Sequence, residues 1–399
     1  MKPHSLTAPY AAVQAVFWMS FCVTIAFAAV YLQALGYSNT ELGAILAAGN
    51  LFGTVLGPSL CAHIDADARR SAAHYIPVIL AAQSAALLVL LLVPVKGVVT
   101  TLAFIAAGAF CIALNSLLLK LYVDAEHAGV PIQFSTARGF GSIAYVLLSA
   151  LLGVLITRLS VHILPLFGLL LCAVQLLLCR HVARALPASG TASAAQSEKQ
   201  GTSLAGFARK YPHFCLVLLG TVPVFFAHNT LNNFLINITR NVGGSTLSMG
   251  YLNAFIAAVE IPVMLLFFRI RGKLSSAAFL GIAYGAFLLK TLAVAAAPTV
   301  PALFAAFLLQ APSFGLYAPV SVDYAADAVP YEDSAKAQSL SYSTTTVGSV
   351  LSGVISGRLF DAVSVTQTLL IASGICAVGL AVSLFGLFDK SIEHQKARA

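Results

Sequence analysis

The sequence predicts an all-α membrane protein in which twelve transmembrane helices form two six-helix halves. Three observations support this fold class: few charges, repeated apolar stretches of membrane-spanning length, and one long polar interruption near the middle of the chain. Of 399 residues, 59% are hydrophobic and 9% are charged, with a mean hydropathy of +0.90, whereas soluble domains carry about 25% charged residues. The surface of this protein must therefore face lipid.

Apolar runs of about 20 residues can cross the bilayer, and their backbone groups are satisfied there only in helices. The second run begins with Ser38-Asn39-Thr40-Glu41, a capping box that starts a helix. The run from Ala11 exceeds the length of a signal-peptide core, so we expect it to be the first span. We place the twelve spans at 11–35, 41–63, 73–95, 98–121, 132–157, 161–182, 211–236, 246–269, 275–296, 300–322, 336–357 and 366–388.

A polar segment divides these spans into two sets of six. Residues 184–210 are rich in small and polar residues, which is typical of a flexible linker without a core. We therefore expect an N-terminal half at 1–183, a cytoplasmic linker at 184–210 and a C-terminal half at 211–399. This layout suggests a binding site between the halves.

The distribution of Lys and Arg predicts the orientation, because these residues accumulate in cytoplasmic loops. With a cytoplasmic N-terminus, seventeen of the 22 fall on that side and four on the other, while Lys290 remains in the membrane. Both termini should therefore be cytoplasmic, in a bacterial-type inner membrane. The net charge of +8 is spread over short loops, so it fits membrane orientation better than nucleic-acid binding. The seven cysteines show no Cys-x-x-Cys spacing, and we expect no metal and no cofactor.

Three ionisable residues, Arg138, Glu260 and Lys290, interrupt otherwise apolar spans. Because a charge at the bilayer centre costs about 2.5–3.5 kcal/mol on insertion scales, such residues usually have a functional or structural partner. Arg138 either grips a substrate or extends to the inner interface. Glu260 either carries a proton, binds substrate, or pairs structurally with Lys290. Two cations against one anion favour an anionic substrate.

Polar and aromatic residues also recur at helical spacing and suggest a polar cavity. Gln310, Ser313, Tyr317 and Ser321 share one stripe, and Asn253 lies seven residues from Glu260, on the same helical face. Any one of these residues could instead make a hydrogen bond between helices, as could His228. The predicted substrate-binding residues are Trp18, Arg138, Asn232, Asn253, Gln310 and Tyr317. Glycines at 49, 53 and 57 predict close helix packing, either static or sliding.

Several short motifs resemble the major facilitator superfamily, within the branch of lactose permease, phenylpropionate permeases and nucleoside–proton symporters. The loop at 61–70 keeps Asp65, Arg69 and Arg70 of that superfamily's signature loop but lacks its glycines. The other matching motifs are Arg138-Gly139-Phe140-Gly141, Glu260-Ile261-Pro262, Gln310-x-x-Ser313-Phe314-Gly315-Leu316, and Lys336-Ala337-Gln338 followed by Gly348, Gly353, Gly357 and Asp361.

The resemblance implies the major facilitator fold, substrate binding by Arg138 and a conformational role for the loop with Asp65, Arg69 and Arg70. The sequence departs from lactose permease where Lys120 occupies roughly the position of the sugar-binding glutamate. Gln310 and Ser313 also replace its coupling His and Glu, and Lys290 replaces an expected Arg. Proton coupling should therefore involve Glu260, with Lys290 adjusting it.

We expect a secondary active transporter, not an enzyme, that moves a small polar or anionic organic solute by alternating access and proton symport. We expect it to act as a monomer in the lipid bilayer. Alternatives within this class are an efflux antiporter for sugars or drugs and an uncoupled facilitator. A membrane receptor or scaffold would be the alternative from another class, but it would not explain buried charges in both halves.

Overall fold

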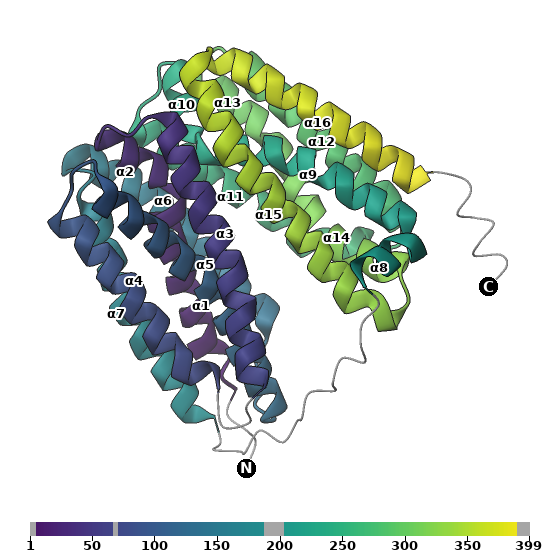
Figure 1. Ribbon diagram of the computed structural model, residues 1–399, viewed down its shortest axis with the longest axis horizontal. Coiled ribbons are helices and arrows are strands. Elements are labelled where there is room, and N and C mark those ends of the chain that lie inside the picture. Colours follow the sequence, from purple (N-terminus) through teal and green to yellow (C-terminus); the bar gives the residue numbers. More distant parts are fainter. Residues whose placement is uncertain (1–4, 67–70, 187–202, 389–399) are drawn as a thin grey trace. The chain divides into compact units, whose positions relative to one another are not determined.

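The computed structural model describes residues 5–66, 71–186 and 203–388, and these residues form helices without any strand (Figure 1). They divide into two compact units, Met1–Gln200 with Gly244–Ala258 and Gly201–Gly243 with Val259–Ala399. The division between Ala258 and Val259 falls inside one helix, α11 (Thr246–Ile270). The predicted boundaries of the two halves remain predictions.

Unit 1 is a bundle of long helices in which α4 packs against α5 and α7, and α3 packs against α5. Its first span is not one regular helix, because a π-helical turn, η1, interrupts it. The start of α11 belongs to this unit as well. The other elements are α1 (Thr7–Phe21), η1 (Cys22–Ala26), α2 (Ala28–Ala34), α3 (Asn39–Asp65), α4 (Ala72–Leu92), α5 (Val98–His127), α6 (Phe134–Arg158) and α7 (Ile163–Ala185).

Unit 2 is built around α9, which packs against α15 and α16, while α12 packs against α14 and α16. Its tenth span is also irregular, because a 3-10 turn (η2) and a π-helical turn (η3) separate α13 from α14. The elements are α8 (Leu204–Lys210), α9 (Pro212–Asn233), α10 (Leu235–Asn241), the end of α11, α12 (Ser276–Ala296), α13 (Val300–Phe307), η2 (Leu308–Gln310), η3 (Ala311–Gly315), α14 (Leu316–Ala328), α15 (Tyr331–Ala362) and α16 (Val365–Phe388).

Eleven of the predicted spans coincide with helices that are long and apolar enough to cross a membrane, counted over the described residues. The predicted span at 336–357 lies in α15, a helix of 32 residues that is not among these eleven. Its Ser and Thr residues lower the hydropathy. Several of them donate to carbonyls of their own helix, as Ser343 Oγ does to Ser339 O at 2.9 Å, which is how a helix accommodates hydroxyls.

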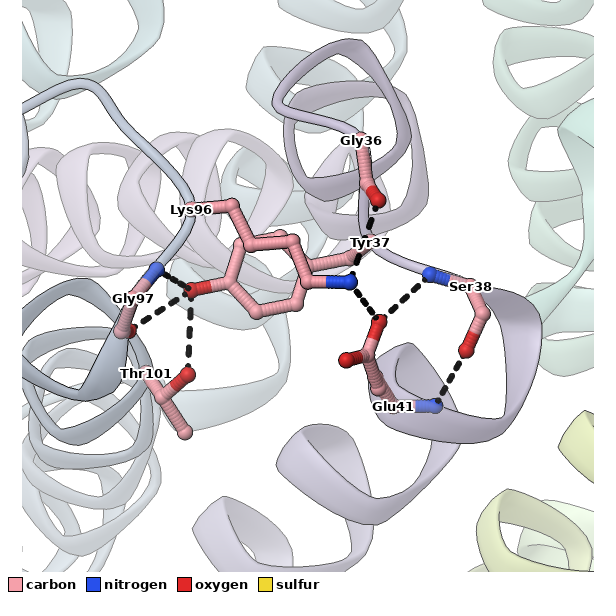
Figure 2. A network of polar contacts seen from close by, with 7 residues as sticks. All are labelled: Gly36, Tyr37, Ser38, Glu41, Lys96, Gly97 and Thr101. Atoms are coloured by element: carbon pink, nitrogen blue, oxygen red, sulfur yellow. Dashed lines mark hydrogen bonds and ion pairs between the residues drawn. The ribbon is translucent and has the colours of Figure 1, made fainter.

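The predicted capping box at the start of α3 is confirmed, and it is part of a larger polar network (Figure 2). Ser38 Oγ accepts from Glu41 N at 3.2 Å, and Ser38 N donates to Glu41 Oε2 at 2.8 Å. Lys96 Nζ donates to the same carboxylate oxygen at 2.6 Å. Tyr37 OH donates to Gly97 O at 3.0 Å. These bonds tie the turn before α3 to the turn between α4 and α5.

The glycines of α3 allow the close packing that their spacing predicts. A Cβ on Gly53 would lie 2.7 Å from Ala109 O and 2.6 Å from a carbon of Ile112, both in α5. Such a contact requires a glycine, because the backbone of α5 cannot yield without moving the helix. The close approach of α3 to α5 is therefore fixed within unit 1.

The C-terminal part of the predicted linker is helical. Its residues 187–202 lie outside the described part of the chain, but Leu204–Lys210 forms helix α8 and Phe207 is buried. Phe207 packs with Phe214 and Ala337 in a hydrophobic cluster, so the expectation that no core reaches Lys210 is wrong. In the sequence, Phe207–Lys210 cannot be distinguished from the polar run before it, because one aromatic residue gives too little apolar periodicity to predict a packed helix.

An ion pair fastens α8 to the start of α15, outside the predicted spans. Lys210 Nζ lies 2.8 Å from Asp333 Oδ2, and Tyr211 OH donates to the same oxygen at 2.5 Å. These two donors lower the pKa of the Asp333 carboxyl, and the carboxylate raises the pKa of Lys210. A lowered carboxyl pKa means that this contact is present above the ordinary pKa of aspartate.

We expect Ser38→Ala to lower the free energy of unfolding by about 1 kcal/mol, because the first turn of α3 loses its cap. Equilibrium unfolding in mixed micelles measures this change. Ser71→Ala is the matched control, since Ser71 precedes α4 without capping its backbone. Equal effects of the two substitutions would contradict the role given to the capping box.

We expect Asp333→Asn to increase hydrogen exchange in residues 204–210, because α8 loses its ionic contact with α15. In the wild type, the same protection should be lost as the pH falls through the lowered pKa of Asp333. Exchange rates must be corrected for their intrinsic pH dependence. Asp327→Asn, an exposed residue of α14, is the control. Unchanged protection in Asp333→Asn would refute the contact's role.

Candidate functional site

A continuous chain of polar side chains crosses the interior of unit 2. Gln310 bridges two charged residues: its Nε2 donates to Glu260 Oε1 at 2.6 Å, and its Oε1 accepts from Lys290 Nζ at 2.6 Å. Beyond Lys290, the Nζ atom lies 3.2 Å from His228 Nδ1. His228 Nε2 lies 3.0 Å from Asn232 Nδ2. Five side chains from four spans thus form the Glu260–Asn232 chain.

Local backbone geometry places these groups. His228 and Asn232 are four residues apart on α9, so they lie one above the other. Gln310 ends the 3-10 turn η2 and is followed by the π-helical turn η3, which contains Pro312. Such turns often mark functional positions, because they re-aim side chains within a helix. Here the irregular segment presents Gln310 to both α11 and α12.

The middle of the chain is fully enclosed. Lys290 is 0% exposed, Gln310 1% and His228 5%, whereas Glu260 is half-buried. An aromatic shell surrounds the three buried residues: Phe314 stacks on His228 at 5.0 Å, and Lys290 Nζ lies 4.7 Å from the centre of Phe287. A buried charge is tolerated only when its hydrogen-bonding capacity is satisfied. The hydrogen bond from Lys290 to Gln310 therefore offsets part of the free-energy cost of burying the amine.

The bridge also fixes the hydrogen-bond directions. A Lys290 ammonium has only donors, so Gln310 must present its oxygen to Lys290 and its amide N–H to Glu260. The ammonium likewise donates to His228 Nδ1, which makes Nε2–H the protonated position of a neutral imidazole. The Asn232 amide nitrogen faces Nε2 at 3.0 Å in the structure, so with Nε2 protonated the amide must be turned over for its oxygen to accept. This assignment follows from hydrogen-bonding capacity, since Asn oxygen and nitrogen positions are interchangeable by a flip.

The residues predicted for proton coupling, Glu260 and Lys290, therefore belong to one cluster, but a glutamine joins them. Gln310 and Asn232, predicted to bind substrate, also lie in this chain. Tyr317 is 6% exposed and packs at 4.8 Å from Phe225 in the hydrophobic core of unit 2. Substrate binding by Gln310, Asn232 and Tyr317 stays a prediction.

Unit 1 holds a second cluster around Arg138. The guanidinium carbon of Arg138 lies 3.8 Å from the centre of the Trp18 ring, a cation–π stack. Arg138 also donates from Nη1 to Ser142 Oγ at 2.9 Å. Gly141 permits this arrangement, because a Cβ there would lie 2.5 Å from Trp18 Cδ1. Two predicted substrate-binding residues are thus in direct contact.

Asn253, also predicted to bind substrate, contacts the same face of α6 nearer to its C-terminal end. Its Nδ2 donates to Tyr145 OH and to Ser149 Oγ, both at 2.9 Å. Ser149 Oγ donates in turn to Gly250 O at 3.1 Å. Asn253 and Glu260 are both in α11, but they belong to different units.

Asp65, the first member of the predicted conformational loop, ends α3 and forms an ion pair with Lys120 at 2.8 Å. Lys120 also contacts Asp124 at 3.0 Å, one turn along α5. Arg69 and Arg70 lie outside the described residues. Lys120, at roughly the position of a sugar-binding glutamate in lactose permease, is thus committed to two carboxylates in unit 1.

Sequence reasoning missed several members of these clusters. It named Arg138 but not Ser142, Tyr145 and Ser149, although residues at spacings of four, seven and eleven share one helical face. It treated His228 as a weak candidate, although Asn232 follows it by one turn. Among the described residues, no group of three or more His, Cys, Asp or Glu side chains could hold a metal ion.

Comparison with known proteins agrees with this architecture. The model of the MFS_1 like family matches residues 10–371. The fold is similar to that of a mutant of the nucleoside transporter NupG, with a TM-score of 0.79 at 15% identity over 95% of this chain and 99% of that one.

Two other solved structures share the fold. They are the POT family transporter PepTSo, with a TM-score of 0.73 at 11% identity over 97% of this chain and 98% of that one, and a bacterial homolog of the human lysosomal transporter Spinster, with 0.66 at 13% over 95% and 96%. No curated protein matches the sequence. At these identities the structural likeness shows the fold alone.

We expect Gln310→Met to lower the free energy of unfolding by about 1–3 kcal/mol, because it leaves a buried amine and a carboxylate without their shared partner. Equilibrium unfolding in mixed micelles at neutral pH measures the loss. Gln338→Met, the same change at an exposed position of α15, should change stability by less than about 0.5 kcal/mol. If the two variants were equally stable, the bridge would not support the cluster.

Proposed function

Because the chain belongs to the MFS_1 like family of transporters, we propose that it moves a small polar or anionic organic solute across the inner membrane by proton symport. The family and the structural neighbours are transporters, not enzymes. The solute class, the coupling ion and the roles of individual residues are what we propose beyond membership of the family. The Glu260–Gln310–Lys290 bridge is the observation that carries it.

Glu260 is the residue that takes and releases the proton. It is half-buried, at the exposed end of the chain, and it lies in a span of high hydropathy where carboxylates are expensive and usually functional. Protonation neutralises the carboxylate and weakens its charge-assisted bond from Gln310 Nε2, because hydrogen bonds to ionised acceptors are about twice as strong as neutral ones. The bridge thus senses the protonation state of Glu260.

The charge balance favours an anionic solute. With Glu260 ionised and Lys290 protonated, the buried cluster is close to neutral, but protonation of Glu260 leaves the Lys290 charge uncompensated. A solute anion held nearby would offset this charge, so proton and anion would bind cooperatively. A neutral polar solute would lack this electrostatic advantage.

Arg138 is the residue that binds the solute. Its guanidinium stacks on Trp18, which holds the planar fork in a defined plane. A fixed fork suits a carboxylate, which it contacts through two parallel hydrogen bonds, and it can also donate to paired hydroxyls. The Trp18 ring adds an apolar surface beside that grip. Solutes with a flat ring and an acidic or hydroxylated group therefore fit best.

NupG, whose fold resembles that of this chain, is a nucleoside transporter, so nucleosides are a second solute class to test. Benzoate, phenylpropionate, uridine and maltotriose cover aromatic acids, a nucleoside and an oligosaccharide. The shift of the thermal unfolding temperature of the purified protein with each probe ranks them, because a ligand stabilises the state that it binds. Stabilisation by an aromatic acid supports the proposal, and stabilisation by maltotriose alone contradicts it.

We expect Glu260→Gln to abolish accumulation of the most stabilising probe in proteoliposomes under a pH gradient, while exchange of labelled for unlabelled probe persists. The neutral amide cannot release a proton but preserves the shape of the side chain. Glu332→Gln, an exposed residue of α15, should accumulate the probe like the wild type. Full accumulation by Glu260→Gln would refute coupling through Glu260, and efflux driven by an inward proton gradient would indicate an antiporter.

We expect Arg138→Lys to weaken binding of the same probe by about tenfold or more, since an ammonium cannot replace the two parallel donors or the planar stack. The dissociation constant from calorimetry measures this change. Arg158→Lys, at the opposite end of α6, is the matched control and should bind like the wild type. Equal affinities of the two variants would exclude Arg138 from the binding site.

A further inference from the structure

His228 is a buried base that the proposed coupling leaves without a function. It is 5% exposed and lies between two polar groups of different kinds. Nδ1 faces the Lys290 amine at 3.2 Å, whereas Nε2 faces the Asn232 amide at 3.0 Å. An imidazole with both nitrogens engaged on opposite sides can accept a proton at one nitrogen and release another from the other.

Aromatic contacts keep the ring in this orientation. Phe314 is stacked on the imidazole, with an interplanar angle of 10°, and Phe225 and Phe287 meet its edge at ring distances of 5.5 and 5.2 Å. Three sides of the ring are therefore apolar. Because the ring cannot turn freely between them, its two nitrogens retain separate partners, one on α12 and one on α9.

The other side of Lys290 offers no proton path through Gln310. The Gln310 side chain contacts Lys290 through its amide oxygen and Glu260 through its amide nitrogen. A primary amide accepts and donates hydrogen bonds but does not titrate, so it transmits charge effects without carrying protons. Cys376 of α16 is the further titratable group within electrostatic range of Lys290. The imidazole is thus the connection suited to proton transfer.

We propose that His228 is the proton relay of Lys290, passing protons between its buried amine and water at the Asn232 end. The Nζ–H bond breaks and leaves its electron pair on Nζ while an N–H bond forms at Nδ1, giving a neutral amine and an imidazolium. The imidazolium then loses its Nε2 proton to a water molecule. His228 is left neutral with a proton on Nδ1, which donates back to the Lys290 lone pair.

The reverse steps recharge Lys290. A hydronium ion protonates Nε2, and the Nδ1 proton moves to Nζ. Asn232 is half-buried, so the Nε2 side is the less enclosed end of the path. The relay rests on the proposed function in one respect: it gives the transporter a second exchangeable charge, which can leave when protonation of Glu260 removes the anion that balances Lys290.

The test compares His228→Gln with the wild type in proteoliposomes on a solid-supported membrane. A pH jump without solute produces a transient current as protons bind. Glutamine offers Lys290 a hydrogen-bond acceptor but cannot carry a proton. The substitution therefore distinguishes proton transfer by His228 from a role in holding the Lys290 side chain in place. We expect the current component from Lys290 to decay ~100-fold more slowly in His228→Gln, in line with the effect of removing a general acid–base group.

Three further variants complete the design. His162→Gln, the same change at an exposed position, should behave like the wild type. Asn232→Leu should also slow the component by closing the Nε2 end, and it serves if His228→Gln does not fold. Lys290→Met should abolish the component and so identifies it. A wild-type decay in folded His228→Gln or in folded Asn232→Leu would overturn the relay.

Different measurements test the relay and the proposed function, so either one can be refuted without the other. Glu260→Gln tests the coupling carboxylate through solute accumulation, whereas His228→Gln is judged by the solute-free proton current. A normal relay in a protein that accumulates no solute would refute the symport proposal alone. Two results together would support proton transfer in the measured step. The current should decay more slowly in His228→Gln than in the wild type, and the wild-type current should decay more slowly in D₂O than in H₂O.

Discussion

The interior of unit 2 is organised around one interaction: a fully buried amine and a half-buried carboxylate in an apolar helix bundle share a hydrogen-bonding partner. Gln310 is this partner, with two hydrogen bonds of 2.6 Å, one to Lys290 and one to Glu260. An amide is suited to the position because it donates on one side and accepts on the other. Gln310 ends the 3-10 turn η2 and precedes the π-helical turn η3, and from this irregular segment it reaches residues of two other helices.

Unit 1 holds its cation differently. Arg138 is half-buried rather than enclosed, and its contacts include the Trp18 ring and the Ser142 hydroxyl. Its guanidinium is more weakly hydrated than an ammonium, so stacking on Trp18 suits it better than it would suit Lys290. One unit therefore holds a half-buried cation stacked on an aromatic ring, while the other holds a fully buried cation inside a hydrogen-bonded chain. This difference supports separate roles in binding and coupling.

The fold followed from the sequence because spanning length and apolar composition are local properties. The capping box of Ser38 and Glu41 and the close packing of Gly53 were predicted for the same reason. α15 departs from the pattern of an apolar span because its hydroxyls form hydrogen bonds within the helix, as at Ser343, or with Thr230 of α9, as at Ser356, and hydropathy does not register such bonds. Phe207 likewise turned part of the expected linker into a packed helix, and a single aromatic residue gives no periodic signal.

The site was predicted in its members but not in its connections. Arg138, Glu260 and Lys290 stood out because charges are rare in such spans, and charge is visible in one residue at a time. The Gln310 bridge and the His228 contact depend on which helices are neighbours and on the irregular turns of the tenth span. Sequence spacing within one helix cannot supply that information. The α6 stripe through Ser142 and Tyr145 was available from spacing, and it would have extended the Arg138 site.

The central claim is that Glu260 gains and loses a proton inside the membrane. Infrared difference spectroscopy of the reconstituted protein during a pH change measures this directly, because a protonated carboxyl has a carbonyl stretch that a carboxylate lacks. The account predicts that a carboxyl band appears on acidification of the wild type, persists in Glu41→Gln and is absent in Glu260→Gln. An unchanged band in Glu260→Gln would contradict the account.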